Sequence, residues 1–300
     1  MARVLLTGAS GQVGLELLKT LAPLGEVVAP GRGEMDLADE ASVRRQIREV
    51  QPRWIVNPAA YTAVDKAESE PELAYAINEA AVRAIGEEAQ KIGAGVIHFS
   101  TDYVFDGTGT KAYVEDDPTG PISVYGASKL AGEKALAASG AGHMIFRTSW
   151  VYGATGKNFL LTILKLARER EKLRIVADQY GAPTWSRDLA KMTARAIDWT
   201  EASARGIELK DALPRWSGVY HAAGAGETTW FGFAAEAVRL AGERDPGAKL
   251  AELEGITTAE YPTPAKRPSN SRMNCDKLAA SFGWKMMDWK DSLREVMAAI

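Results

Sequence analysis

The N-terminal stretch Arg3-Val-Leu-Leu-Thr7, followed by Gly8-Ala-Ser-Gly11-Gln-Val-Gly14, decides the fold. Its first part is an apolar run of the strand type, and the apolar residues of Leu15–Leu21 return at helical spacing. Glycines between a strand and a helix let the backbone approach a pyrophosphate, which then lies at the helix N-terminus. The alternative is an ordinary tight turn, because the glycine spacing is GxxGxxG rather than GxGxxG. In this context the stretch predicts a dinucleotide site with contacts from Gly8, Gly11, Gln12, Val13 and Gly14.

Strands and helices alternate through the first half of the chain. This alternation is typical of parallel βαβ units and predicts an α/β fold with a Rossmann-type, doubly wound parallel sheet. The expected strands are Arg3–Thr7, Glu26–Ala29, Trp54–Asn57, Val96–Thr101 and Met144–Arg147, and the expected helices are Leu15–Leu21, Ala41–Val50, Pro71–Ile92 and Tyr125–Ala138.

The second half keeps its helices, but its strand signals are short and scattered. We therefore predict two domains, an NAD(P)-binding Rossmann domain at 1–150 and a smaller substrate-binding lobe at 151–300. The chain is free to cross between them more than once. The helices expected in the second half are Phe159–Arg170, Arg187–Ala202, Trp230–Ala241 and Leu293–Ala299.

Composition narrows the class of protein. Of the 300 residues, 46% are hydrophobic and 25% are charged, as in soluble globular enzymes. The formal net charge of −3 gives no support to nucleic-acid binding. No apolar stretch reaches the roughly 18 residues of a membrane span, and Met1 leads into the first strand without a signal-peptide pattern. Cys275 is the one cysteine, which fits a reducing compartment. We expect a cytoplasmic protein that binds neither nucleic acid nor membrane.

The segment Tyr125-Gly-Ala-Ser-Lys129 carries the clearest chemistry. Its i, i+4 spacing places a phenol and an ammonium group on one face of a helix. A nearby cation favours the phenolate, which makes the phenol a better proton donor. Thr101 lies at the end of the fourth expected strand and adds a hydroxyl group. We predict that Thr101, Tyr125 and Lys129 form a catalytic triad beside a nicotinamide.

The end of the second expected strand bears on the choice of cofactor. An NAD site usually has an acidic residue there, which binds the ribose 2′-hydroxyl. This chain has Pro30-Gly31-Arg32-Gly33 instead, and Arg32 is able to pair with a 2′-phosphate. We therefore predict NADPH, with NADH as the alternative because Glu34 follows closely. Asp36 and Leu37 are expected beside the adenine ring.

The glycine loop together with the Tyr-x-x-x-Lys motif resembles the extended short-chain dehydrogenase/reductase superfamily. Longer strings, spread over nearly the whole chain, are similar to the dTDP-4-dehydrorhamnose reductase family. These strings are Asn57-Pro-Ala-Ala-Tyr-Thr-Ala-Val-Asp-Lys-Ala-Glu68, Ser100-Thr-Asp-Tyr-Val-Phe-Asp-Gly107, Val124-Tyr-Gly-Ala-Ser-Lys-Leu-Ala-Gly-Glu-Lys134, Arg147-Thr-Ser-Trp-Val-Tyr152, Asp178-Gln-Tyr-Gly-Ala-Pro-Thr184 and Tyr261-Pro-Thr-Pro-Ala-Lys-Arg-Pro-Ser-Asn-Ser-Arg272.

The resemblance implies a reaction in dTDP-rhamnose biosynthesis, a supply route for polysaccharides. In that family NAD(P)H reduces the C4 keto group of dTDP-6-deoxy-L-lyxo-4-hexulose (dTDP-4-dehydrorhamnose) to give dTDP-L-rhamnose. Tyr125 would act as the general acid, Lys129 would hold the nicotinamide ribose, and Thr101 would bind the carbonyl oxygen. By position, the family's cofactor contacts fall on Gly11, Gln12, Val13, Asp36, Leu37, Ala60, Tyr61, Thr62 and Phe99, its sugar contacts on Thr101, Asp102 and Trp150, and its diphosphate contacts on Lys266 and Arg267.

One departure from the family concerns a metal. Some relatives dimerise through a magnesium site built from three glutamates, of which Glu16 matches the first. Arg187 and Ala299 fall where the others would be, and one carboxylate beside an arginine is a poor site for a hard cation. We expect no metal, and a monomer or a metal-independent homodimer.

Two other functions stay open on this fold. A nucleotide-sugar dehydratase or epimerase is the first, although a dehydratase needs a second carboxylic acid where this chain has Tyr103 after Asp102. The second is a non-catalytic NADP-binding subunit that resembles the regulatory subunit of methionine adenosyltransferase. Retained cofactor binding without turnover would favour that second function.

Overall fold

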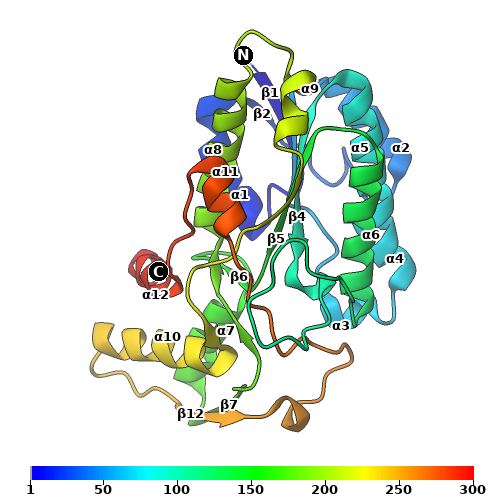
Figure 1. Ribbon diagram of the computed structural model, residues 1–300. Coiled ribbons are helices and arrows are strands. Elements are labelled where there is room, and N and C mark those ends of the chain that lie inside the picture. Colours follow the sequence, from blue (N-terminus) through cyan, green and yellow to red (C-terminus); the bar gives the residue numbers. More distant parts are fainter. Residues whose placement is uncertain (1) are drawn as a thin grey trace.

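The computed structural model describes residues 2–300 and contains a parallel sheet of six strands (Figure 1). The strand order is β10-β5-β4-β3-β1-β2, and each neighbouring pair is parallel. The order reverses at β1, which is the point where ligands bind in doubly wound sheets. The strands are β1 (Ala2–Leu6), β2 (Gly25–Val28), β3 (Trp54–Asn57), β4 (Gly95–Thr101), β5 (His143–Thr148) and β10 (Gly218–His221).

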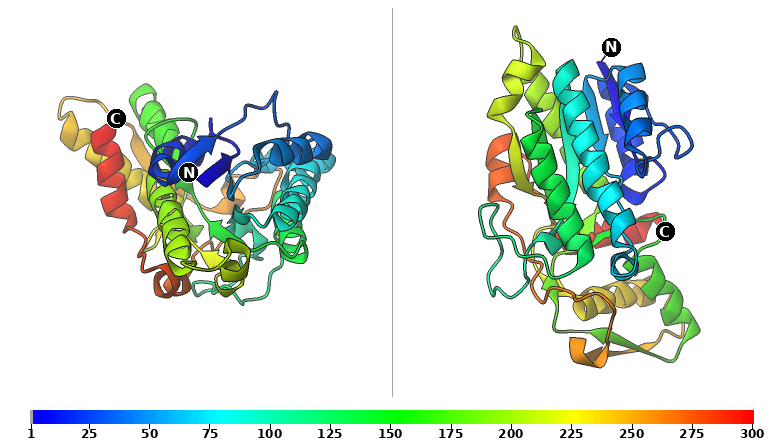
Figure 2. Two further views of the ribbon diagram at one scale, coloured as in Figure 1. Left: turned by 90° about the horizontal axis from the view of Figure 1, so that it is seen from above. Right: turned by 90° about the vertical axis from the view of Figure 1, so that its right-hand side faces the viewer.

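Helices cover both faces of the sheet, as the view from above in Figure 2 shows. Residues alternate along β1, so that Val4 and Leu6 enter one apolar core and Leu5 enters the other. The first core is closed by α1 (Gln12–Leu21), α8 (Ser186–Ser203) and α11 (Asp276–Phe282), and the second by α2 (Glu40–Val50), α5 (Ala81–Ile92) and α6 (Val124–Ala138).

A smaller lobe lies beyond the carboxyl ends of the strands (Figure 2). Its strands β7 (Lys172–Val176) and β12 (Glu252–Ile256) pair in parallel, and its helices enclose two further apolar clusters. The helices are α7 (Phe159–Glu169), α10 (Trp230–Arg244) and α12 (Trp289–Ala299), and the short strand pairs are β6 (Val151–Tyr152) with β9 (Thr184–Trp185) and β8 (Tyr180–Gly181) with β11 (Thr228–Thr229).

Short helical elements fill the connections. The α4 helix (Pro71–Tyr75), the π-helical turn η2 (Ala76–Ala80) and α5 follow one another without a break, so that helical structure spans the whole stretch expected over 71–92. None of the helices in the described part of the chain is long and apolar enough to cross a membrane. The remaining elements are η1 (Ala22–Leu24), α3 (Val64–Ala67), η3 (Asp102–Val104), α9 (Leu209–Ala212), η4 (Leu213–Arg215) and η5 (Thr258–Glu260).

The predicted α/β class and parallel sheet are confirmed. The sequence did not predict β10, β7 or β12, because each is short and pairs with a strand distant in sequence. Segments from after residue 150, among them β10, α8 and α11, pack with the N-terminal elements. The division of the chain at residue 150 stays a prediction.

Candidate functional site

The glycine loop adopts a shape that only glycine permits. Gly8 has φ +57°, a left-handed conformation that strains other residues. A Cβ on Gly14 would lie 2.1 Å from the Gly8 carbonyl oxygen, so the loop is folded tightly against the helix. The α1 helix begins at Gln12, and it has neither a side-chain cap nor an acidic residue in its first turn. Its N-terminus is therefore open to an anion.

A groove runs from this loop in two directions. One part, of about 690 Å³, extends toward the loop after β2, and the other, of about 480 Å³, extends toward α6. The two parts share Gly8, Ser10 and Ala60, so they are continuous. Every residue predicted to bind the cofactor lines this groove, namely Gly8, Gly11, Gln12, Val13, Gly14, Arg32, Asp36, Leu37, Ala60, Tyr61, Thr62, Phe99, Tyr125 and Lys129.

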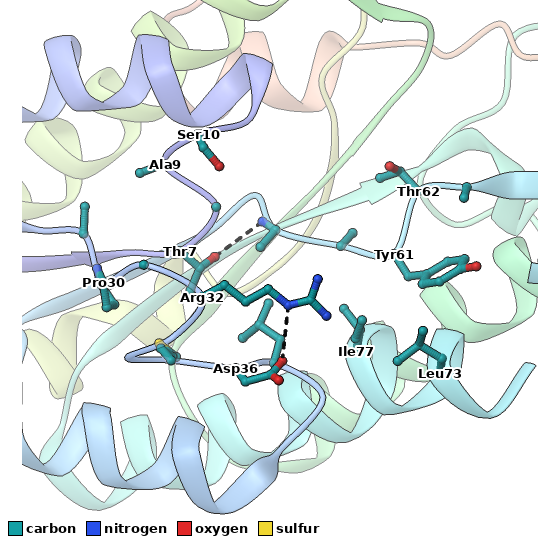
Figure 3. A pocket seen from close by; sticks show the side chains of 18 of the residues that line it. Thr7, Ala9, Ser10, Pro30, Arg32, Asp36, Tyr61, Thr62, Leu73 and Ile77 are labelled. Atoms are coloured by element: carbon teal, nitrogen blue, oxygen red, sulfur yellow. Dashed lines mark hydrogen bonds and ion pairs between the residues drawn. The ribbon is translucent and has the colours of Figure 1, made fainter. Parts of the chain in front are cut away.

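Arg32 extends across the first part of the groove toward Asp36 (Figure 3). Its Nε lies 3.9 Å from the nearer Asp36 oxygen, and its side chain is 79% exposed. The Glu34 carboxylate accepts a hydrogen bond of 2.7 Å from the Gly31 backbone N–H and does not line the groove. Arg32 is thus the cation that the β2 end presents to a ligand.

Tyr125 and Lys129 line the second part of the groove, and the buried Thr101 hydroxyl lies within hydrogen-bonding reach of Tyr125. Thr101 ends β4, and α6 carries Tyr125 and Lys129 one turn apart. Ser123 caps α6, since its hydroxyl accepts a hydrogen bond from Gly126 N–H at 3.2 Å. A cap of this kind fixes where the helix begins and hence where Tyr125 stands.

A buried ion pair holds α6 on the sheet. Arg147 of β5 donates to both oxygens of Glu133 on α6, with a closest distance of 2.7 Å. Both side chains are buried, so separating them would leave a charge without a partner. The pair therefore fixes the helix that carries Tyr125 and Lys129 relative to β4 and β5.

Burial changes the pKa values of both Tyr125 and Lys129. It raises the pKa of Tyr125 to about 12, while the hydrogen bond with Thr101 opposes that rise and the nearby Asp102 adds to it. Burial lowers the pKa of Lys129 to about 8, which Glu133 partly opposes. At neutral pH the phenol therefore keeps its proton, and the lysine is close to its titration range.

Asp102 is a buried carboxyl group at the same strand end. Thr101 Oγ1 donates a hydrogen bond of 2.9 Å to its Oδ1, while Oδ2 makes no well-formed hydrogen bond within the described residues, with the Ser271 side chain nearby. Burial raises the pKa of Asp102 to about 6. The unpartnered oxygen suits a polar group of a bound ligand.

Sequence reasoning missed the residues that hold Lys129. Lys129 Nζ donates to the Phe99 carbonyl oxygen at 2.6 Å and lies 3.2 Å from His98 Nε2. His98 contacts Asn57 in turn, at 3.0 Å. Both are fully buried, and nothing in their spacing along the sequence points to α6. Only the pairing of β3 with β4 brings them together.

Trp150 follows β5 in a strained conformation. Its φ is +48°, which is unusual for a bulky residue. This backbone strain destabilises the folded state, and the packing of the side chain must offset it. Its ring stacks on Trp230 with 3.8 Å between the ring centroids. Gly181 lies against the ring, since a Cβ there would stand 2.8 Å from it. The indole is thereby clamped between α10 and β8.

A second groove, of about 640 Å³, opens in the smaller lobe. Aromatic rings and cations line it together, including Trp230, Tyr261, Arg174 and Arg267. The structure thus brings Arg267 to a groove, whereas Lys266 is exposed and lines neither groove. Flat apolar rings beside cations are the partners that a nucleoside diphosphate requires.

Comparison with known proteins identifies the family of this chain. The family model described as RmlD substrate binding domain matches residues 2–300. The chain belongs to this family. The dTDP-4-dehydrorhamnose reductase of Burkholderia thailandensis is 45% identical over 291 residues, which cover 96% of this chain and 95% of the relative.

Solved structures of dTDP-4-dehydrorhamnose reductases have the same fold as this chain. The dTDP-4-dehydrorhamnose reductase of Clostridium acetobutylicum superposes with a TM-score of 0.89 at 34% identity, covering 99% of each chain. The enzyme of the same name from Bacillus anthracis, solved in complex with NADP, gives a TM-score of 0.88 at 33% identity. That match covers 100% of this chain and 99% of the other.

The expected departure from the RmlD family at Glu16 has a structural counterpart. Arg187 Nε lies 3.0 Å from one Glu16 oxygen, and Lys19 Nζ lies 3.2 Å from the other. Their positive charges lower the pKa of Glu16, although burial opposes them. Within residues 2–300, no group of three or more His, Cys, Asp or Glu side chains is placed to hold a metal ion. The oligomeric state stays a prediction.

Proposed function

We propose that this chain catalyses the NADPH-dependent reduction of the C4 keto group of dTDP-4-dehydrorhamnose to give dTDP-L-rhamnose. The observation that carries the proposal is the continuous groove, which leads from the glycine loop to Tyr125, Lys129 and the end of β4. The names of the full-length relatives supply the substrate class, and the NADP complex of the Bacillus anthracis enzyme supplies the cofactor class.

The residues of the groove fit a dinucleotide. The tightly folded glycine loop and the open N-terminus of α1 suit its diphosphate, and Arg32 suits a 2′-phosphate. NADPH, when bound, supplies the hydride that the carbonyl carbon accepts. Lys129 would hold the nicotinamide ribose, because its side-chain nitrogen lies at the wall of the groove and carries N–H donors in both its amine and its ammonium form.

Proton transfer falls to Tyr125. As the C4 carbonyl becomes an alkoxide, the phenol O–H breaks and its proton passes to the substrate oxygen. The high pKa of Tyr125 keeps the phenol protonated beforehand, which is the state that a reductase needs. Thr101 would donate a hydrogen bond to the same oxygen as charge develops on it.

The substrate would span the space between the two grooves. Its nucleoside and diphosphate suit the second groove, where Tyr261 and Arg267 lie, with Lys266 contributing charge from the surface. The sugar would then lie near Trp150 and Asp102. This arrangement favours the two-lobe division at 1–150 and 151–300, with the active site between the lobes.

A reductase fits the strand end better than a dehydratase. The residue after Asp102 is Tyr103, whose ring packs edge-on against Tyr125 with 5.5 Å between the centroids. It supplies no second carboxyl group for the elimination of water. We further propose that the enzyme acts in the cytoplasm, as a monomer or a metal-independent homodimer.

The test is to follow NADPH oxidation with dTDP-6-deoxy-L-lyxo-4-hexulose, for the wild type and for Tyr125→Phe. We expect turnover in the wild type and a fall in kcat of about 100-fold or more in the variant, with NADPH binding retained. Bound NADPH without wild-type turnover would contradict the proposal. It would favour a different keto-sugar or the non-catalytic regulatory function.

A further inference from the structure

A line of buried polar side chains runs beneath the cofactor groove and ends at Lys129. It starts at Thr7, directly before the glycine loop, and continues through Asn57 of β3 and His98 of β4. The Thr7 Oγ1 to Asn57 Oδ1 distance is 2.5 Å, the Asn57 Nδ2 to His98 Nδ1 distance is 3.0 Å, and the His98 Nε2 to Lys129 Nζ distance is 3.2 Å. All four residues are 3% exposed or less.

The first two links fix the direction of the line. The Ala59 backbone N–H donates to Thr7 Oγ1 at 3.4 Å, as the dashed line at Thr7 in Figure 3 shows. The Thr7 hydroxyl then donates to Asn57, and a separation of 2.5 Å suits an O–H···O bond but is short for N–H···O. The carboxamide therefore turns its oxygen toward Thr7 and its NH₂ group toward His98.

The hydrogen bond from Asn57 also determines which ring nitrogen of His98 carries the proton that faces Lys129. Since Asn57 Nδ2 donates to His98 Nδ1, a neutral imidazole carries its proton on Nε2. The ring is neutral, because burial, the adjacent Lys129 and, to a smaller extent, His143 lower the pKa of His98 well below its usual value, although the Asn57 backbone opposes them. Its Nε2–H therefore points at Lys129 Nζ, which also donates to the Phe99 carbonyl oxygen. An ammonium group has no lone pair for that N–H, whereas an amine has one.

We propose that Asn57 and His98 are positioning residues for Lys129, and that the one-way line from Thr7 favours the amine form of this lysine. With Lys129 in its amine form, no positive charge stands beside the phenol of Tyr125, so the phenol keeps its proton until the substrate is in place. Once the phenolate forms, the ammonium form gains a partner one helical turn away. The catalytic role of this hydrogen-bonded line rests on the proposed reductase function, whereas the experiment that tests its effect on Lys129 does not.

Few other charges compete at this position. On α6 itself, Tyr125 and Glu133 are the titratable neighbours, and Arg147 of β5 neutralises Glu133. Asp102 acts on Tyr125 from the end of β4, and Lys157 lines the same part of the groove. A substitution at Thr7 leaves all of these groups in place. Because Thr7 also lines the cofactor groove and accepts from Ala59 N–H, the deciding measurement is one made without cofactor.

The test compares Thr7→Val, which removes the hydroxyl, with Thr7→Ser, which keeps it. Thr193→Val is the matched control, because Thr193 is a buried threonine of α8 whose hydroxyl binds the Leu189 carbonyl oxygen. Without the Thr7 hydroxyl, the Asn57 carboxamide is free to turn, and His98 can then accept a hydrogen bond from an ammonium. The pKa of Lys129, which burial lowers to about 8, should then be higher in the variant than in the wild type.

The readout needs neither cofactor nor substrate. Between pH 8 and 10.5 the unfolded chain binds more protons at this lysine than the folded one, so the free energy of unfolding rises with pH. We expect a smaller rise in Thr7→Val and an unchanged one in Thr7→Ser and Thr193→Val. A second readout is the pH dependence of NADPH binding, whose inflection should move upward by at least half a pH unit in Thr7→Val.

Coincident pH curves for Thr7→Val and the wild type would overturn the inference, as would equal changes in Thr7→Val and Thr193→Val. If Thr7→Val does not fold, His98→Gln replaces it, because its carboxamide can turn its oxygen toward Lys129 and accept a hydrogen bond from the ammonium form. That variant should reduce the rise with pH in the same way, and an unchanged rise would count against the inference. If the protein proved not to be a reductase, the unfolding experiment would still test the effect of the line on Lys129.

Discussion

Arg267 and Asp65 form a two-pronged ion pair. Arg267 Nη1 lies 3.1 Å from Asp65 Oδ1, and Nη2 lies 2.8 Å from Oδ2. Asp65 also accepts a hydrogen bond from the Ala265 backbone N–H at 3.2 Å. The hydrogen bond from Arg267 is the main reason that the pKa of Asp65 is lowered. The pair ties α3, beside the cofactor groove, to the loop that borders the second groove.

Arg267→Ala should therefore weaken substrate binding more than cofactor binding. We expect the KM for the dTDP-sugar to rise about tenfold or more, since a hydrogen bond to a charged group is worth about 1.5–3 kcal/mol. Asp65→Asn keeps the arginine but loosens its hold, so its effect on KM should be smaller. Steady-state kinetics on both variants give the comparison. Equal effects would mean that Arg267 acts only by holding the loop.

Arg32→Ala should change the preference between cofactors. Arg32 is the cation at the β2 end of the groove, and only NADPH carries a 2′-phosphate to pair with it. We expect the Kd for NADPH to rise about tenfold and the Kd for NADH to stay within about twofold. Fluorescence titration with each cofactor measures both values. An equal loss for the two cofactors would refute the role given to Arg32.

Gly181→Ala should disturb Trp150. The added methyl group would stand 2.8 Å from the indole, and overpacking of this kind costs about 1–3 kcal/mol. Because we propose that Trp150 lies near the sugar, we expect a higher KM for the dTDP-sugar and an unchanged Kd for NADPH. Gly247→Ala is the control, since Gly247 is exposed and has no close carbon neighbour. A normal KM in Gly181→Ala would show that the indole does not define the sugar site.

The buried carboxyl group of Asp102 should change how the free energy of unfolding depends on pH. Burial raises the pKa of its carboxyl group from 3.8 to about 6, so between these values the folded protein keeps a proton that the unfolded chain has lost. This group therefore makes the free energy of unfolding fall as the pH rises from about 4 to 6. Asp102→Asn removes that contribution. Urea unfolding at several pH values measures it, and parallel curves for variant and wild type would contradict the assignment.

Magnesium should not change the oligomeric state. Glu16 already has two cationic partners, Arg187 and Lys19, so a metal ion would have to displace them. We expect the same molar mass by light scattering in excess Mg²⁺ and in a chelator. A metal-driven increase in mass that Glu16→Gln abolishes would overturn the prediction.

The sequence predicted the fold because its signals were local. An apolar run, three glycines and a helical repeat are all read within 21 residues, and they anticipated β1, the loop and α1. The predicted helix at Tyr125–Ala138 begins within one residue of α6. The residues proposed for the cofactor were drawn from several short strings, yet all of them line one groove. The resemblance to the family supplied many of these residues, and they meet in space because the strings lie at or after the carboxyl ends of parallel strands, at one edge of the sheet.

The sequence by itself thus determined the α/β class, the glycine loop and the Tyr125–Lys129 pair, since each depends on neighbours in the chain. Only the tertiary structure decided what surrounds them. His98 and Asn57 reach Lys129 because β3 and β4 pair in register, and Arg267 meets Asp65 across about 200 residues of chain. Spacing along the sequence carries no trace of such contacts. They arise when packing buries polar groups that must then find partners in space.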